Sequence, residues 1–250
     1  MITFKSPDDF KKMSKAGKVV KNIHEEIHSI AKVGTTLLEL DLIAKKIIDS
    51  SGCKSNFFGY RGYPSYICAS PNNVIVHGIP TKYSLKDGDI LSIDVGAVFE
   101  GVHADAAVTY GIGEISSDAE KLLEVTKSAL MESIKLVKSG QRLGTIGSLI
   151  ESIGEKNSYG VVKEYIGHGI GFEMHEDPQV PNYGKKGTGF KLKKGMAICI
   201  EPMFNLGTSQ TFVDTDGWTV KTKDGSISAH FEHTIGITSE GVEVFTSNDL

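Results

Sequence analysis

The sequence has few cysteines, little net charge and no long hydrophobic run, and each absence excludes a class of protein. Its three cysteines, an odd number, fit a reducing compartment better than a disulfide-stabilised secreted domain. The formal net charge of −4 over 250 residues gives no general case for nucleic-acid recognition. No segment reaches the roughly 18 apolar residues that a bilayer crossing needs, and the N-terminus lacks a signal-peptide stretch. We therefore expect a cytoplasmic protein with no membrane association and no direct nucleic-acid recognition.

The chain contains an internal repeat, and an acidic residue ends each copy. Residues 85–94 and 192–201 both begin Leu-Lys-x-Gly, continue as an apolar run and end in Ile followed by a carboxylate. Each half of the chain shows too few elements to close a core alone. The repeat therefore predicts a single domain over 1–250, with pseudo-symmetric halves at roughly 1–115 and 116–250.

Capping motifs and hydrophobic periodicity predict two helices followed by strands, twice over. Ser6-Pro7 and the capping box from Thr36 to Glu39 begin the first two helices. A capping box from Ser117 to Glu120 begins a helix to about residue 138, and a shorter helix follows to about residue 157. The predicted strands are 90–97, 102–110, 161–167, 171–175, 196–203, 210–215, 218–222 and 228–238. This order is typical of an α+β fold with a curved, mostly antiparallel sheet backed by two helix pairs.

Two aspartates lie on opposite arms of the predicted hairpin at 90–110. Because side chains alternate along a strand, a two-residue turn at Glu100-Gly101 makes Asp94 and Asp105 diagonal neighbours on one face. Two half-buried carboxylates would repel each other, and a cation would relieve that repulsion. The alternative is a solvent-facing hairpin on which the two acids have no function. Without other evidence, the hairpin sequence favours this alternative.

Glu201 and Glu232 change that balance, because each lies in an apolar strand sequence where an unpartnered glutamate is rare. Glu201 matches Asp94 in the repeat. Glu232 falls on the strand of the second half that corresponds to the strand with Asp105 in the first half. His168, in a glycine-rich turn, adds a nitrogen donor. Such a set suits Mn, Fe(II), Co or Zn, and bridging carboxylates would hold two divalent ions roughly 3.5–4 Å apart.

Two other features allow different interpretations. His77, beside Gly78 in a loop, could contact a substrate or cap a turn. Cys68 and His77 could form a Cys-His nucleophile, but this leaves the carboxylates unexplained. The glycines around His168 lack the spacing of a nucleotide-binding fingerprint.

Together these motifs resemble the methionine aminopeptidases, which have the pita-bread metallopeptidase fold, and the resemblance covers essentially the whole chain. The motifs that carry it are Val76-His-Gly-Ile-Pro80, Ile93-Asp94 with Ala104-Asp105, Gly167-His-Gly-Ile-Gly171, His175-Glu-Asp-Pro-Gln-Val180, Ile200-Glu-Pro-Met203 and Phe231-Glu-His-Thr234. The chain has no zinc-finger extension and no room for a helical insertion between His175 and Glu201. It is therefore most similar to the short bacterial type I form.

The resemblance implies a single catalytic domain with two divalent metal ions (Co, Mn, Fe(II) or Zn). Asp94 would chelate one ion, and Asp105 and Glu232 would bridge both. His168 and Glu201 would complete the shell of the other ion. Glu201 would also be catalytic, as the proton shuttle.

The resemblance also implies a pocket for a methionine side chain, with His77 and His175 as catalytic residues that contact the substrate near the scissile amide. The implied pocket residues are Phe57, Tyr60, Tyr63, Cys68, His77, Met174, His175 and Trp218. Met174 stands where an aromatic residue is usual, and Phe57 stands where a smaller cysteine is common. We expect these two changes to alter the pocket's shape and not the reaction type.

The implied function is removal of the initiator methionine from nascent polypeptides with a small second residue, by attack of a metal-bridging water. The nearest alternative is a proline-specific pita-bread aminopeptidase, which would carry a further N-terminal domain. A non-catalytic binding protein on the same fold is a second alternative, but such relatives lose ligands that are all present here. The expected partners are nascent peptide N-termini, with a transient ribosome contact left open, and the chain is expected to be a monomer.

Overall fold

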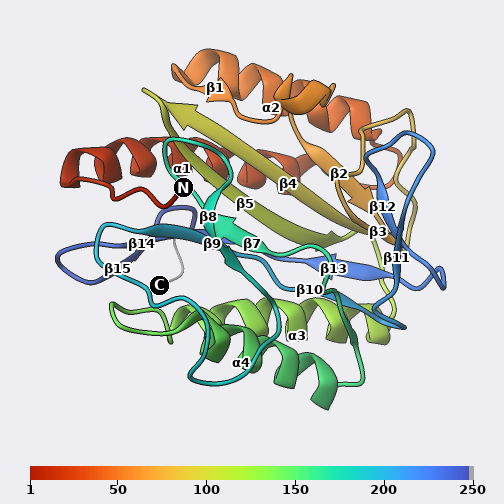
Figure 1. The fold of residues 1–250 in the computed structure, drawn as a ribbon. Helices are drawn as coiled ribbons and strands as arrows, with labels where there is room; N and C mark the ends of the chain where they lie inside the picture. Colours follow the sequence, from red (N-terminus) through yellow and green to blue (C-terminus); the bar gives the residue numbers. More distant parts are fainter. Residues whose placement is uncertain (248–250) are drawn as a thin grey trace.

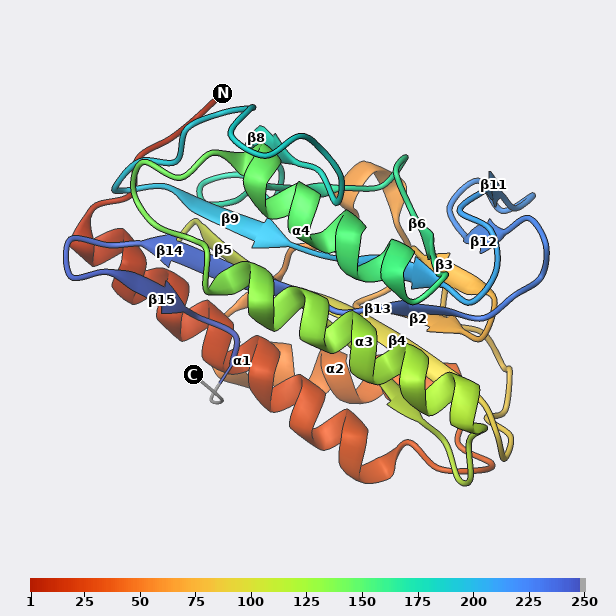
Figure 2. The same ribbon diagram turned by 90° about the horizontal axis from the view of Figure 1, so that it is seen from below.

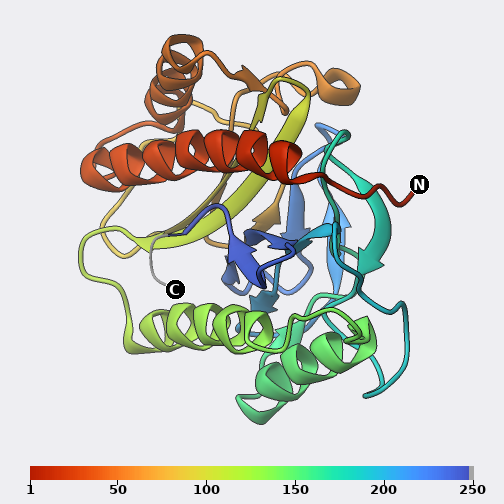
Figure 3. The same cartoon turned by 90° about the vertical axis from the view of Figure 1, so that its left-hand side faces the viewer.

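Two helix pairs flank the strands on opposite sides (Figures 1 and 3). The computed structural model describes residues 1–247, and residues 248–250 of the predicted domain lie outside the described part. The helices are α1 (Pro7–Ile30), α2 (Leu37–Ser51), α3 (Ser117–Ile134) and α4 (Leu143–Lys156). α1 and α2 form one outer layer, and α3 and α4 form the other, which confirms the predicted architecture.

Both helices of the first pair begin at a capping box, as the sequence predicts. The Ser6 hydroxyl accepts a hydrogen bond from Asp9 N, and the Asp9 carboxylate accepts one from Ser6 N. Thr36 and Glu39 make the same reciprocal pair at α2. These pairs satisfy backbone N–H groups that a helix leaves without partners in its first turn.

The cap of α3 lies one residue before the predicted one. Ser116 is the N-cap, and its hydroxyl accepts a hydrogen bond from Ala119 N. Ser117 is already the first helical residue, so the predicted capping box of Ser117 and Glu120 is wrong. The helix also ends at Ile134, earlier than the predicted residue 138.

The strands are short apart from one long hairpin, β4 and β5. The strands are β1 (Lys54–Ser55), β2 (Cys68–Pro71), β3 (Val74–Val76), β4 (Ile90–Phe99), β5 (Val102–Gly111), β6 (Gly160–Val161), β7 (Gly167–Gly169), β8 (Glu176–Val180), β9 (Ala197–Ile200), β10 (Met203–Asn205), β11 (Thr211–Val213), β12 (Val220–Thr222), β13 (Ser228–His230), β14 (His233–Ile237) and β15 (Val242–Val244). Phe99 pairs with Val102, so the predicted turn at Glu100-Gly101 is confirmed. Both turn residues have positive φ, 47° for Glu100 and 79° for Gly101, as a two-residue type I′ hairpin turn requires.

Hydrogen bonds divide the strands into four sheets, and every strand pair in the described part of the chain is antiparallel. The sheet orders are β1-β4-β2 with β5 on β4, β13-β10-β6, β11-β12-β3 and β15-β14-β9-β7-β8. Two bonds between a side chain and the backbone join β5 to β14: Thr234 Oγ1 accepts from Asp105 N at 2.8 Å and donates to Asp105 O at 2.7 Å.

The predicted strand at 171–175 is wrong. These residues form bends, and the strand begins only at Glu176. The Glu176 carboxylate accepts hydrogen bonds from Phe172 N at 2.8 Å and Glu173 N at 3.2 Å. Because both backbone N–H groups donate to one carboxylate, the segment forms a turn and does not pair with a neighbouring strand.

The core has two main parts, one beneath each helix pair. The first packs α1 and α2 against β4 and β5, with Met13 and Ile93 fully buried. The second packs α3 and α4 against strands that include β9 and β13 (Figure 2). Leu122 and Ile198 are fully buried there. Burying one such side chain contributes about 1.5–3 kcal/mol. Within residues 1–247, none of the helices combines the length and hydrophobicity that crossing a membrane requires.

Candidate active site

The predicted site residues line one cavity of about 350 Å³. The residues that line it are Phe57, Tyr60, Arg61, Tyr63, Cys68, His77, Asp94, Asp105, His168, Met174, His175, Glu201, Trp218 and Glu232. Each predicted ligand and each predicted pocket residue is in this set, and Arg61 is the one addition. The candidate metal ligands and the apolar pocket residues therefore line the same cavity.

Asp94 and Asp105 lie on one face of the long hairpin. Asp94 pairs with Ala107, and Gly96 pairs with Asp105, so the two aspartates are diagonal neighbours as the alternation predicts. One carboxylate oxygen from each of them and one from Glu232 lie within 4.8 Å of one another. The hairpin thus presents two acids to a third that comes from the other end of the chain.

Glu201 and Glu232 do not lie within strands, which corrects the sequence prediction for both. Glu201 follows the last residue of β9, and Pro202 separates it from β10. Glu232 lies between β13 and β14, and its N–H donates to Ala107 O at 2.8 Å. A proline has no N–H for a ladder, and Glu232 bonds across to β5, so both acids stand at breaks between strands.

His168 lies in strand β7 and not in a turn, and its tautomer is set by a backbone acceptor. Its Nδ1 donates to Gly169 O at 2.8 Å, which leaves Nε2 as the ring nitrogen that faces the cavity, 3.7 Å from Glu201 Oε1. A Cβ on Gly167 would lie 2.3 Å from Cys199 O, and one on Gly169 would lie 2.2 Å from Asp177 O. Glycine at both positions lets neighbouring strands approach close to the histidine.

The carboxylates fit a divalent cation. Within the described chain, Asp94 Oδ1, Asp105 Oδ1 and Glu232 Oε1 are buried and have no hydrogen-bond partner. Burial and the nearby Asp105 raise the pKa of Asp94 well above its ordinary value, and burial and the same neighbour do so for Glu232. Burial raises the pKa of Asp105 to about 6. These oxygens have no hydrogen-bond donor, and the carboxyl groups ionise unfavourably without a nearby positive charge. A hard or borderline divalent cation would supply both the partner and the charge.

Glu201 has a different electrostatic environment, and its neighbour His230 was not identified from the sequence. His230 Nε2 lies 3.6 Å from Glu201 Oε2; the His230 side chain is almost fully buried, and that of Glu201 is 12% exposed. Burial raises the pKa of Glu201, but His230 and His168 outweigh it and hold that pKa below its ordinary value. His230 stands two residues before Glu232, so the shared face of an extended segment was the available sequence signal.

Cys199 lies beside this donor set. The sequence suggests a small core residue, and Cys199 is fully buried. Its Sγ also lies within 4.8 Å of donor atoms of His168 and Glu232. Burial and Glu232 raise the pKa of the thiol well above its ordinary value. A neutral thiol is a weak ligand, so Cys199 packs behind the carboxylates and histidine.

An apolar cluster forms the rest of the cavity wall. Phe57, Tyr63, Cys68 and Met174 are buried together, and Trp218 packs against them. Tyr63 meets Trp218 edge to face, with ring centroids 5.1 Å apart. Burial raises the pKa of the Cys68 thiol well above its usual range, and Cys68 pairs directly with Asp94 across β2 and β4. A thiol held neutral beside a carboxylate is unsuited to nucleophilic attack, which disfavours the Cys-His alternative.

His77 and His175 face the cavity from different loops. His77 follows β3 with φ of 59°, a left-handed conformation that is uncommon outside glycine. His175 Nδ1 lies 2.9 Å from Tyr60 Oη, and its ring centroid lies 4.3 Å from that of His168. Burial lowers the pKa of His77, and burial with the nearby His168 lowers the pKa of His175 to about 4. Both imidazoles are therefore neutral at neutral pH.

Arg61 is a lining residue that the sequence interpretation missed. It lies in the 3₁₀ turn η1 (Tyr60–Gly62) with φ of 48°, and its guanidinium lies 5.3 Å from the Tyr60 ring centroid. Its position between Tyr60 and Tyr63, both predicted pocket residues, was the only available signal.

The model of metallopeptidase family M24 matches residues 11–239 of the chain. The chain belongs to this family. Membership implies use of a divalent metal, which the donor set described above fits. The chain is similar to methionine aminopeptidase 1 of Bacillus subtilis, with 46% identity over 246 residues that cover 98% of this chain and 99% of the relative.

Solved structures show the same fold. The crystal structure of methionine aminopeptidase from Thermotoga maritima matches with a TM-score of 0.97 and 44% identity, over 99% of this chain and 100% of that one. The Xaa-Pro dipeptidase from Bacillus anthracis matches with a TM-score of 0.77 and 23% identity, and the match spans 62% of that longer chain. The second likeness shows the fold alone. Together they confirm the predicted pita-bread architecture.

Proposed function

We propose that this metallopeptidase removes the N-terminal methionine from polypeptides whose second residue is small. The observation that carries the proposal is one cavity that joins a group of side chains suited to hold a cation to a partly aromatic apolar cluster. A free N-terminus and the first peptide bond can lie at the donors while the first side chain fills the apolar part. The full-length likeness to methionine aminopeptidases supports the same activity.

The donor set suits two divalent ions. Asp94 would hold one ion, Asp105 and Glu232 would bridge both, and His168 and Glu201 would hold the other. The support is the closeness of the Asp94, Asp105 and Glu232 oxygens and the cavity-facing Nε2 of His168. When bound, such ions supply Lewis acidity that polarises a carbonyl and lowers the pKa of a water.

The chain's own side chains supply the proton transfer and the substrate contacts. Glu201 is ionised at neutral pH, because His230 and His168 hold its pKa low, so its carboxylate can take a proton from water and return it to the leaving amine. His175 is oriented by the Tyr60 hydroxyl, and neutral His175 and His77 can donate or accept at the scissile amide.

The apolar cluster would select methionine. Its walls offer Tyr63 and Trp218 as ring surfaces and Met174 as a polarisable thioether, with no charged group among its members. Sulfur packs favourably against aromatic edges, and a flexible thioether adapts to a partner of the same kind. Phe57, where a smaller residue is common, narrows the same wall.

We further propose that residues 1–250 form one catalytic domain, whose halves divide near residue 115, and that it acts as a monomer in the cytoplasm on nascent chains, with any ribosome contact transient. Three unpaired, buried cysteines within the described residues are consistent with a reducing compartment. Contacts of β5 with β13 and β14, and the hydrogen bonds between Asp105 and Thr234, link the two parts of the core and support a single folding unit.

The test is hydrolysis of short peptides by metal-depleted protein, before and after addition of Mn, Co, Fe(II) or Zn. Met-Ala-Ser should be cleaved only after metal addition, and far faster than Met-Ile-Ser or Leu-Ala-Ser. Faster cleavage of an X-Pro peptide would favour the proline-specific alternative. Metal binding without cleavage of any peptide would favour the non-catalytic binding protein, and full activity in excess chelator would exclude the metal mechanism.

A further inference from the structure

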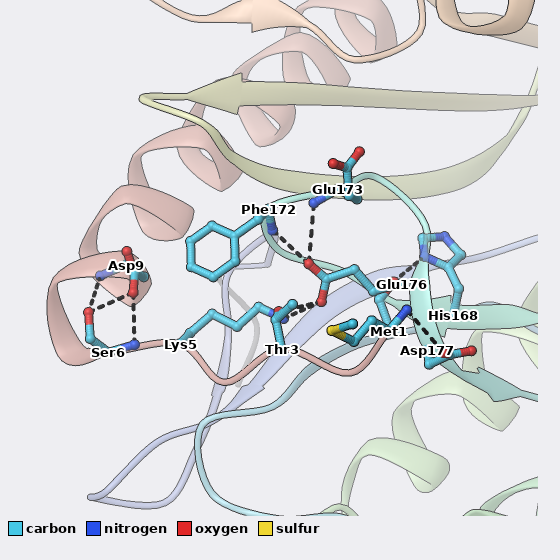
Figure 4. A network of polar contacts seen from close by, with 11 residues as sticks. Met1, Thr3, Lys5, Ser6, Asp9, His168, Phe172, Glu173, Glu176 and Asp177 are labelled. Atoms are coloured by element: carbon cyan, nitrogen blue, oxygen red, sulfur yellow. Dashed lines mark hydrogen bonds and ion pairs between the residues drawn. The ribbon is translucent and has the colours of Figure 1, made fainter.

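The N-terminal arm, residues 1–6, lies against the turn that runs from Phe172 to Glu176 (Figure 4). The same turn contains Met174 and His175. The arm has no regular secondary structure, yet it is fixed by a backbone bond from Lys5 N to Gly195 O of 2.7 Å. At its start, the Met1 ammonium lies 3.0 Å from the Asp177 carboxylate. The arm therefore follows one defined path beside the candidate active site.

One carboxylate joins the arm to that turn. Glu176 Oε2 accepts hydrogen bonds from Thr3 Oγ1 at 2.5 Å and from Lys5 Nζ at 2.7 Å. Glu176 Oε1 accepts the two backbone bonds, from Phe172 N and Glu173 N, that close the turn. Both oxygens are thus saturated, one by the arm and one by the turn (Figure 4).

The ion pair in this junction is buried. The Lys5 and Glu176 side chains are 1% and 2% exposed. Burying an ion pair removes both charges from water, and its Coulomb energy often does no more than offset that cost. Such a pair contributes little net stability but strongly favours one geometry, because any displacement leaves a buried charge without its partner.

The geometry that it favours is that of the substrate-facing turn. Glu176 directly follows His175, so the carboxylate that the arm holds is attached to the backbone beside that imidazole. Met174, in the same turn, is packed into the apolar cluster. Glu176 also pairs with Gly169 at the start of β8, next to His168 in β7. Placement of the turn therefore decides where His175 and Met174 stand.

We propose that the N-terminal arm is a positioning element, in which Lys5 and Thr3 act through Glu176 to hold His175 and Met174 against the bound substrate. The inference rests on the proposed aminopeptidase function. It assigns a role in that function to a segment that does not contact the substrate. Its prediction is that loosening the arm changes substrate affinity and selectivity while metal binding is kept.

The experiment compares Lys5→Met with Lys11→Met in the metal-loaded full chain. Lys11 pairs with Asp8 at the surface, where both side chains are more than three-quarters exposed (76% and 81%), so Lys11→Met is the matched control. The readouts are bound metal, kcat and KM for Met-Ala-Ser, and the ratio of kcat/KM for Met-Ala-Ser to that for Leu-Ala-Ser. Lys5→Met should raise KM, lower kcat/KM about tenfold or more, and reduce the ratio, because a small misplacement of contacting groups is costly. Lys11→Met should match the parent protein.

Two more variants keep the test decisive if Lys5→Met folds poorly. Thr3→Val removes one bond and no charge, and should shift KM and the ratio in the same direction by a smaller factor. The double change Lys5→Met with Glu176→Gln leaves no unpaired charge and retains an oxygen that can accept from the turn, so it should recover part of the lost kcat/KM.

The outcomes separate this inference from the proposed function. If the parent protein does not cleave Met-Ala-Ser, the proposed function fails. If the parent is active but Lys5→Met and Thr3→Val leave KM and the ratio unchanged, the positioning role is refuted. A fall in kcat that is equal for all peptides, with unchanged KM, would show a loss of folded enzyme alone and would equally refute it.

Discussion

Replacing Asp105 by asparagine should stabilise the metal-free protein, because the fold holds this carboxyl where its charge is unfavourable. Burial raises the pKa of Asp105 from 3.8 to about 6. One pKa unit corresponds to about 1.4 kcal/mol, so ionised Asp105 costs the folded state about 3 kcal/mol at about pH 7.5. Asp105→Asn keeps the shape without the charge. It should raise the free energy of unfolding by about that amount, or the melting temperature by about 6–12 °C for a chain of this size.

The pH dependence of this gain follows from the direction of the shift. Between pH 3.8 and about 6, folded Asp105 keeps a proton that the unfolded chain has released. The penalty therefore grows as pH rises through this window and is complete above it. The stability difference between Asp105→Asn and the parent protein should be small near pH 4 and full above pH 6.

Urea unfolding followed by far-ultraviolet circular dichroism, in excess chelator and in Mn²⁺, measures the effect. Metal at about a hundredfold excess over its Kd stabilises the parent by about 2.7 kcal/mol, and Asp105→Asn should lose most of that, so the variant's advantage of about 3 kcal/mol should nearly vanish. The exposed Glu26→Gln is the control and should change stability by less than about 0.5 kcal/mol. A variant no more stable than the parent in chelator would refute the reasoning.

Three other predictions concern single residues. Glu201→Gln should lower turnover about 10²-fold or more with the fold and bound metal kept, and a near-parental rate would remove Glu201 from proton transfer. His168→Ala should lower metal affinity, whereas His175→Ala should lower the rate at normal metal content; equal metal loss would contradict that assignment. His24 is buried against Ala106 O with a pKa lowered by burial to about 4, so the unfolded chain protonates first as pH falls from 6.5 to 4. Stability should drop by about 3 kcal/mol over that window, and His24→Gln should flatten the drop.

The parts of the fold that sequence predicts well depend on local chemistry. The capping boxes at Ser6 and Thr36 and the Glu100-Gly101 turn involve residues within a few positions of one another, and all three form. Strand alternation alone places Asp94 and Asp105 on one face. The internal repeat indicates where a second acidic residue belongs. That all five candidate donors share one cavity followed from these patterns together with the resemblance, and their roles stay predictions.

The errors and omissions arise where distant groups compete with local pattern. The segment 171–175 has strand-like composition, but the Glu176 carboxylate takes two of its amides, and Lys5 and Thr3 saturate the same carboxylate from the N-terminus. His230 gains its importance only because Glu201, just after the end of β9, comes within 3.6 Å of it. No spacing along the chain reports such a meeting.

The exchange of hydrogen bonds between Asp105 and Thr234 has a consequence for how this enzyme could be divided. It joins β5 of the first half to β14 of the second, and each half contributes some of the candidate metal ligands. A chain cut in the exposed turn near Gly113 would yield two fragments, each with an incomplete set of donors. Neither fragment could hydrolyse a peptide alone, and recovered activity after mixing would measure how well the two pieces find each other again.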